Sequence, residues 1–314
     1  MATIGLESRG TDSPRGPQAA REAERLARRL DDPRLLAFAL NAVFMQTFHR
    51  AGLAVHRDAI GAELVALSAR HGLATYEVLG HLIRLQARCA LADFPGADAH
   101  ACAADRLAER YELPLVGVFT QWYRALRLDA TGQAPVEEVE SAYRAAAARL
   151  DGAGMPGLEL GLLPLALLCL SLRGHAQPAP PPRVASADEG TGSPRVALAD
   201  EAADISRVAL ADEGAGFGPY EPWARPVVLL AQGRRDEAVA KLRHVPDPPR
   251  DLLLEAMWCL VARAAVAVGD REAMERAHAA LAPAAAELAG AGSGLLTLGP
   301  VSHYLDDLAA ALRR

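Results

Sequence analysis

The chain has 314 residues, of which 51% are hydrophobic and 5% aromatic, and its formal net charge at pH 7 is −6. This length allows two domains or one elongated array. The acidic balance argues against a nucleic-acid surface, which would carry a basic stripe. Alanine and leucine, which favour helices, are prominent, whereas runs of β-branched residues are scarce. We therefore predict an all-α protein.

The N-terminal residues 1–17 are rich in glycine, serine, proline and charge, so we expect them to be disordered. They lack the apolar core of a signal peptide. The longest apolar run, 158–172, contains Glu159 and Pro164 and is too short and interrupted to cross a bilayer. We expect a cytoplasmic protein that makes no membrane contact.

The four cysteines of the chain lie in apolar helical contexts, which predicts buried, reduced thiols. They are Cys89, Cys102, Cys169 and Cys259.

Helical patterns fill residues 18–175. One helix ends near Leu30, and Pro33 suits the first position of the next helix, with Asp32 as its cap. The segment 35–48 is almost wholly apolar, so we expect it to be buried on most sides. Three further helices are predicted by stripes of apolar or small residues spaced three and four apart. The stripes are Ile60, Leu64 and Leu67; Ala97, Ala101, Ala104, Ala108 and Tyr111; and Val136, Val139, Tyr143, Ala146 and Leu150.

One unit of about forty residues occurs twice between residues 67 and 128. Residues 67–70 and 107–110 each end a helix, a short break follows, and Arg84 and Arg124 then lie at the same offset. A period near forty is typical of stacked helical hairpins, in which each hairpin buries its apolar face against a neighbour. The sequence therefore predicts an array of stacked helical hairpins, a class of structure that binds other molecules more often than it catalyses reactions.

Residues 176–217 interrupt this pattern. They hold a proline-rich run and a twelve-residue tandem repeat whose units begin at Arg183, Arg195 and Arg207. We interpret them as a disordered low-complexity insertion, with a docking motif as the alternative. Deleting such an insertion should leave the fold intact, because the cost of closing a loop varies only slowly with its length.

The helical pattern resumes in residues 218–314, where we predict that the array continues. Gly233 and Gly269 are spaced nearly as in tetratricopeptide repeats, and Pro283 should kink or shorten a helix. The glycine-rich residues 290–294 predict a flexible connection before a last helix.

Known catalytic and metal-binding motifs do not occur in the sequence. The glycine-rich run is not a phosphate-binding loop, because Leu295 and Leu296 stand where a lysine and a hydroxyl residue are needed. His49 and His56 have no third ligand nearby in the sequence. We predict a protein that is not an enzyme and that holds no cofactor or metal.

A row of polar residues on two predicted helices is the candidate site. His81, Arg84 and Arg88 share one helical face, and the first two positions recur about forty residues later. In tetratricopeptide-like arrays the first helix of each hairpin lines a groove, where charge-assisted hydrogen bonds from arginines would hold an acidic peptide or anion. The alternative is a solvated face that is hydrogen-bonded within the array. The candidate residues are His81, Arg84, Arg88, Gln121 and Arg124.

Several short sequence segments resemble the tetratricopeptide-like sensor regions of large bacterial transcriptional regulators. They are residues 26–36, 92–99, 122–127, 290–294 and 298–305. The similar regulators are the antibiotic-regulatory proteins with a bacterial transcriptional activator domain (SARP) and the large ATP-binding LuxR-type regulators. The resemblance covers roughly residues 21–175 and 218–314. It implies a regulatory helical array, without the DNA-binding and ATPase domains that those regulators also carry.

Three functions follow from these observations. The first is a non-catalytic interaction module, associated with transcriptional regulation, that binds a protein or peptide. The second is a small-molecule-sensing domain of a regulator, with the apolar segments 35–48 and 157–172 as the walls of a pocket. The third is an uncatalogued α-helical enzyme.

Overall fold

The computed structural model describes residues 1–8, 14–150, 155–174 and 216–314. Within these ranges the secondary structure is helical and no β-strand forms; Leu288 and Pro300 make one isolated antiparallel bridge. This confirms the predicted all-α class. The predicted insertion lies outside the described residues except for Gly216 and Phe217, and Phe217 is buried in the core.

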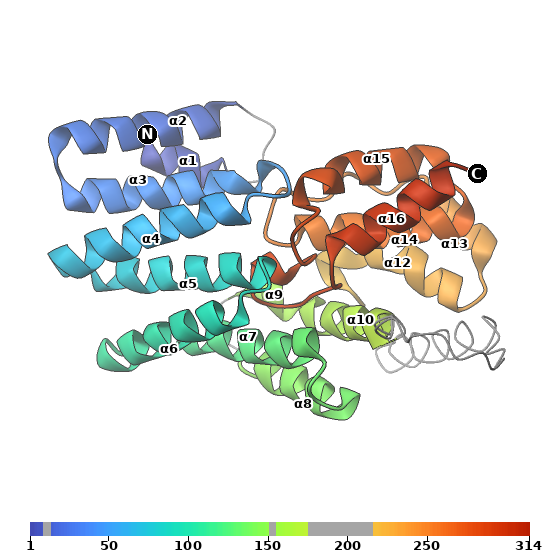
Figure 1. Cartoon of the computed structure of the whole chain (residues 1–314). Coiled ribbons are helices and arrows are strands. Elements are labelled where there is room, and N and C mark those ends of the chain that lie inside the picture. The colour runs from blue at the N-terminus through green and yellow to red at the C-terminus, as the bar shows by residue number, and fades with distance from the viewer. Residues whose placement is uncertain (9–13, 151–154, 175–215) are drawn as a thin grey trace, which may run out of the picture.

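The first eight α-helices follow one another in space as they do in the chain. From α2 to α8 each helix packs against the next, which gives the layers on the left and lower side of Figure 1. The helices are α1 (Ala2–Glu7), α2 (Arg15–Leu30), α3 (Pro33–Met45), α4 (Ala54–His71), α5 (Ala74–Ala90), α6 (Phe94–Arg110), α7 (Val116–Thr131) and α8 (Val136–Ala147), with a 3-10 turn, η1 (Gln46–His49), after α3.

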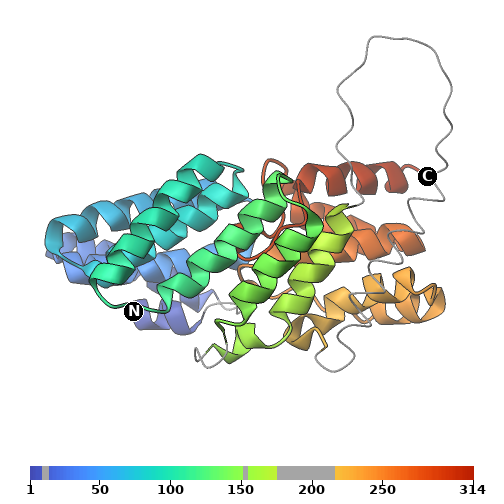
Figure 2. The ribbon, with the colours of Figure 1, turned by 90° about the horizontal axis from the view of Figure 1, so that it is seen from below.

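The remaining helices form a second group. Within it α14 packs against α12, α13, α15 and α16, and Figure 2 shows α8 and α10 between the early helices and this group. The α-helices are α9 (Pro156–Glu159), α10 (Leu162–Gly174), α12 (Glu221–Ala231), α13 (Arg235–Leu242), α14 (Leu254–Val268), α15 (Arg271–Leu281) and α16 (Val301–Leu312). The 3-10 turns are η2 (Gly218–Tyr220), η3 (Ala282–Ala284) and η4 (Ala291–Ser293).

Predicted helix ends agree with the structure at several points. The Asp32 side chain accepts hydrogen bonds from the N–H groups of Arg34 and Leu35, so it caps α3 as expected. Gly72 and Gly269 end α4 and α14 in the left-handed conformation. Helix α15 stops at Leu281, two residues before Pro283, which confirms that this proline shortens the helix.

Most residues of the predicted stripes lie in the core. Ile60, Leu64 and Leu67 are all buried, as are Ala97, Ala101 and Ala104 on α6 and four of the five residues of the stripe on α8. The prediction of burial is wrong at one end of two of the stripes, because Tyr111 and Val136 are 43% and 49% exposed. Cys102 is also exposed, contrary to the prediction of a buried thiol, whereas Cys89, Cys169 and Cys259 are buried and reduced.

The N-terminal segment differs from the prediction of disorder. Residues 2–7 form α1, which packs against α2 and α3. Gly5 makes this close approach possible, because a Cβ atom there would stand 3.1 Å from the Ala20 Cβ and 3.2 Å from the Ala42 Cβ. The Gln46 side chain donates a hydrogen bond to the Gly5 carbonyl. This short helix is thus held by close contact with small residues on its partner helices.

The glycine-rich run before α16 is a buried loop, and the prediction of a flexible connection is wrong. Every residue from Ala289 to Leu298 is buried, and main-chain atoms of this segment are hydrogen-bonded to other parts of the protein. The Leu288 N–H donates to the Ala90 carbonyl, and the Gln86 side chain donates to the Ser293 carbonyl. Gly290 and Gly294 have φ of +77° and +73°, a conformation that favours glycine. The loop therefore joins α5 to the second group of helices.

Candidate functional site

The predicted arginines on α5 are bound to carboxylates of neighbouring segments. Asp58 on α4 accepts hydrogen bonds from Arg84 Nε at 2.9 Å and from Arg88 Nη2 at 3.0 Å. Arg88 also donates to Asp93, which caps α6. Partial burial opposes ionisation of Asp58, but the two guanidinium groups outweigh it and lower the pKa of that carboxyl. The charges of these arginines are therefore largely neutralised inside the protein.

The predicted residues on α7 are also paired. Arg124 donates to Asp105 on α6, and the Thr120 hydroxyl donates to the same carboxylate at 2.7 Å. The Gln121 side-chain oxygen accepts a hydrogen bond from Arg149 at 3.1 Å. Arg124 remains 57% exposed, so its ion pair with Asp105 is a surface contact.

His81 pairs with a histidine that the sequence analysis did not single out. Its Nδ1 lies 2.9 Å from Nδ1 of His100 on α6, and both rings are partly buried. Burial and the nearby Arg84 lower the pKa of His81, and the same two causes lower the pKa of His100 to about 4. At neutral pH both rings are uncharged, and one donates a hydrogen bond to the other.

The five candidate residues thus fall into two sets. His81, Arg84 and Arg88 lie together on α5, and Gln121 and Arg124 lie on α7. Each set is hydrogen-bonded to partners on adjoining helices or directly beside them. Their contacts do not form one continuous row of unpaired cations.

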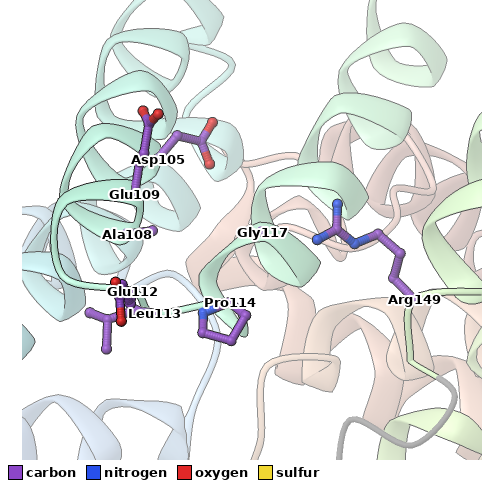
Figure 3. A pocket seen from close by; sticks show the side chains of 8 residues that line it. All are labelled: Asp105, Ala108, Glu109, Glu112, Leu113, Pro114, Gly117 and Arg149. Atoms are coloured by element: carbon purple, nitrogen blue, oxygen red, sulfur yellow. The ribbon is translucent and has the colours of Figure 1, made fainter.

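A cleft of about 500 Å³ opens beside Gln121 and Arg124, the two candidate residues on α7. Asp105 and Glu109 project from α6 on one side, Arg149 approaches from the other side after α8, and Gly117 lies between them (Figure 3). A Cβ atom on Gly117 would stand 3.0 Å from an Arg149 nitrogen, so the glycine leaves room for this guanidinium group. The remaining lining residues are Ala108, Glu112, Leu113 and Pro114.

The turn between α6 and α7 shapes the floor of this cleft. Glu112 has φ of +53°, and the Leu113 N–H donates to the Ala108 carbonyl, which closes the end of α6. Leu113 packs against a small core of Val78, Ala104 and Val116. This anchoring turns Glu112 outward, so three carboxylates and one guanidinium line the cleft.

Sequence reasoning identified the break at residues 111–114 but not the cleft. The signal was present, because Asp105, Glu109 and Glu112 recur at spacings of four and three, which places acidic groups on one face at the end of a helix. The cleft requires the position of Arg149 as well, and this comes from the packing of α8 on α7.

The described residues contain neither a candidate metal site nor a candidate membrane span. No group of three or more histidine, cysteine, aspartate or glutamate residues in the described part of the chain is placed to hold a metal ion. Within the same residues, no helix has the length and apolar character needed to span a bilayer.

Comparison with known proteins adds no relative. No family model matches the chain, and neither a curated protein nor a solved structure matches it.

Proposed function

We propose that the protein is a non-catalytic, tetratricopeptide-like interaction module whose α6–α7 cleft binds a basic segment of a partner protein. Helices α5 and α7 each follow the short break in one of the two sequence units of about forty residues, which supports a repeated helical hairpin. Stacked hairpins of this kind present grooves along which an extended peptide lies. The resemblance of the sequence to sensor regions of bacterial regulators supports a regulatory role.

The charge of the cleft indicates what kind of partner it binds. Asp105, Glu109 and Glu112 face Arg149, and Asp105 is shared with Arg124. Glu109 and Glu112 are exposed and add negative charge at the mouth. Complementary potentials favour a partner of opposite charge, so lysine or arginine side chains fit this cleft better than the acidic peptide suggested by the sequence.

Apolar groups lie near the same turn. Tyr111 and Leu115 flank the turn residues of the cleft and are 43% and 47% exposed. Exposed aromatic and aliphatic side chains beside charged ones are typical of protein interfaces. We therefore expect the partner segment to combine basic residues with at least one apolar anchor.

Peptide binding tests this proposal. Fluorescence anisotropy would compare a lysine- and arginine-rich peptide carrying one leucine with an acidic peptide of the same length. The basic peptide should bind more tightly, with an affinity that falls as salt is added. The double variant Glu109→Lys, Glu112→Lys should weaken this binding at least tenfold.

A matched control separates the cleft from general surface charge. Glu272 and Glu275 are exposed on α15 and are also three residues apart. The double variant Glu272→Lys, Glu275→Lys changes the net charge equally and should leave binding unchanged. Equal weakening by both double variants, or tighter binding of the acidic peptide, would contradict the proposed site.

A further inference from the structure

A second cavity lies where four separate segments of the chain meet. Its walls come from α9 and the residue before it, from η2, from the segment that precedes α14, and from the buried loop after η4. The cavity has a volume of about 320 Å³. This is near the lower end of the range for small-molecule sites, which favours a small organic ligand over a peptide.

The lining of this cavity is mainly apolar. Tyr220, Leu253 and Leu295 are buried in its wall, and three half-buried apolar side chains and the exposed Asp251 complete the lining. Only Leu158 comes from the apolar segments 35–48 and 157–172 that the sequence suggested as pocket walls. The helices of those segments, α3 and α10, instead contribute most of their apolar side chains to the cores. The apolar lining residues are Met155, Leu158, Leu252, Leu253 and Leu295.

Asp251 gives the cavity its charge. It is the one charged residue among the seven that line the cavity, and its side chain is exposed to solvent. Its Oδ1 accepts a hydrogen bond from the Leu253 N–H at 2.9 Å, which fixes the carboxylate while leaving further acceptor positions on its two oxygens. Burial, with a smaller contribution from the Asp251 carboxylate, raises the pKa of Tyr220, another lining residue, to about 12.

We propose that this cavity binds a small amphipathic cation, with its apolar body among the five apolar side chains and its amine against Asp251. A single carboxylate beside an apolar wall complements such a molecule in both charge and polarity. The site is separate from the α6–α7 cleft and does not depend on the function proposed for that cleft. Occupancy would stabilise the contact between α9, η2 and the segment before α14.

Three probes of nearly equal size test the proposal on the full chain. They are 2-phenylethylamine, 2-phenylethanol and phenylacetate, which share an aromatic body and carry a positive, neutral or negative group. Isothermal titration calorimetry should show that the amine binds at least tenfold more tightly than the alcohol, and that phenylacetate binds most weakly. The variant Asp251→Asn keeps an acceptor for the Leu253 N–H and should reduce the affinity for the amine to that for the alcohol.

Two further variants locate the site. Asp306→Asn removes an exposed carboxylate on α16 and should leave all three affinities unchanged. Met155→Trp enlarges a half-buried side chain of the lining and should weaken the amine and the alcohol alike. Circular dichroism would verify that each variant is folded, and if Met155→Trp is not, Leu158→Phe makes a smaller change in the same wall.

Equal affinity for the three probes, or no saturable binding of the amine at millimolar concentration, would show that Asp251 does not select a cation. An amine preference that survives Asp251→Asn would lead to the same conclusion. Binding that is unaffected by the folded Met155→Trp or Leu158→Phe variant would place the probe elsewhere on the protein.

Discussion

At the scale of single residues, the arginines of the candidate site are distinguished by how far each is buried with its partner. Arg84 and Asp58 are 21% and 20% exposed, whereas Arg124 is 57% exposed. Exposed ion pairs contribute little to stability because water and salt screen them, and partly buried pairs contribute more. The sequence placed these two arginines at equivalent positions, but their ion pairs therefore contribute differently to the stability of the protein.

We predict that Arg84→Ala lowers the free energy of unfolding by about 1 kcal/mol, and Arg124→Ala by only a few tenths. Asp58→Ala should cost about 1–2 kcal/mol, because it leaves both Arg84 and Arg88 without this carboxylate. Urea denaturation followed by circular dichroism measures all three. Equal losses for Arg84→Ala and Arg124→Ala would show that burial of the pair does not determine its contribution.

Asp129 shows what the sequence does not reveal about a single carboxyl. It lies in α7, where Tyr143 donates a hydrogen bond to it at 3.0 Å and Arg173 on α10 donates at 2.6 Å. Burial outweighs both partners and raises the pKa of Asp129 to about 6. Neither partner is near it in the chain, so its environment follows only from the packing of α7, α8 and α10.

This environment predicts a pH dependence. An unfolded aspartate releases its proton near pH 4, so the folded protein holds more protons than the unfolded chain between about pH 4 and pH 6. The contribution of Asp129 to stability therefore falls as pH rises through this window, by an amount on the order of 1–3 kcal/mol. Asp129→Asn cannot titrate, so the stability of the wild type relative to this variant should fall between pH 4 and pH 7.

Urea titrations at the two pH values provide the measurement. Asp306→Asn, which removes an exposed carboxylate on α16, serves as the control for the loss of a carboxyl group on the surface. A wild-type advantage over Asp129→Asn that increases with pH would mean that the ion pair with Arg173 outweighs burial.

At the scale of elements, the sequence predicted helices well wherever local patterns determine them. Asp32 with Pro33 started α3, α4 ended at the predicted break after residues 67–70, and Pro283 limited α15 as expected. The errors are α1 and the loop at residues 289–298, both of which are stabilised by contacts with distant parts of the chain. A glycine-rich segment is locally flexible, and only its tertiary neighbours show that it is held. The candidate cleft was missed for the same reason, since Arg149 reaches it through the packing of α8.

Two glycines provide a comparison of local and tertiary constraints. Gly52 and Gly72 have φ of +77° and +65°, so an added Cβ atom is strained at either position. At Gly72 nothing lies within 4 Å of that atom, whereas at Gly52 it would stand 2.1 Å from the Pro283 carbonyl oxygen. Gly52 therefore marks a place where the segment before α4 touches η3 after α15.

We predict that Gly72→Ala costs about 1 kcal/mol of stability, from the left-handed backbone alone. Gly52→Ala should cost at least twice as much, because the backbone at Pro283 must also move. Thermal and urea denaturation of the two variants measure the difference. Similar costs would show that the segment at Pro283 shifts away without disturbing the rest of the structure.

At the scale of the whole molecule, a buried cluster of charges connects the early helices to the later ones. Arg57 on α4 lies 3.9 Å from Glu287 Oε2, and the Ala54 N–H donates to Glu287 Oε1 at 3.0 Å. Arg57 also lies over the Phe48 ring, 5.2 Å from its centre. Burial raises the pKa of Glu255 on α14, and the nearby Arg57 opposes this rise. One arginine thus balances carboxylates from two segments that are far from it in the chain.

We predict that Arg57→Leu destabilises the protein by about 3–5 kcal/mol, because it leaves the carboxylate of Glu287 buried without its cation. Glu287→Gln retains an acceptor for the Ala54 N–H, so the double variant Arg57→Leu, Glu287→Gln should be more stable than Arg57→Leu alone. Urea denaturation of both single variants, the double variant and the wild type completes a double-mutant cycle. A double variant no more stable than Arg57→Leu would mean that the loss comes from the contact with Phe48 rather than from unpaired charge. The expected recovery would instead show that charge balance at this contact holds the two groups of helices together.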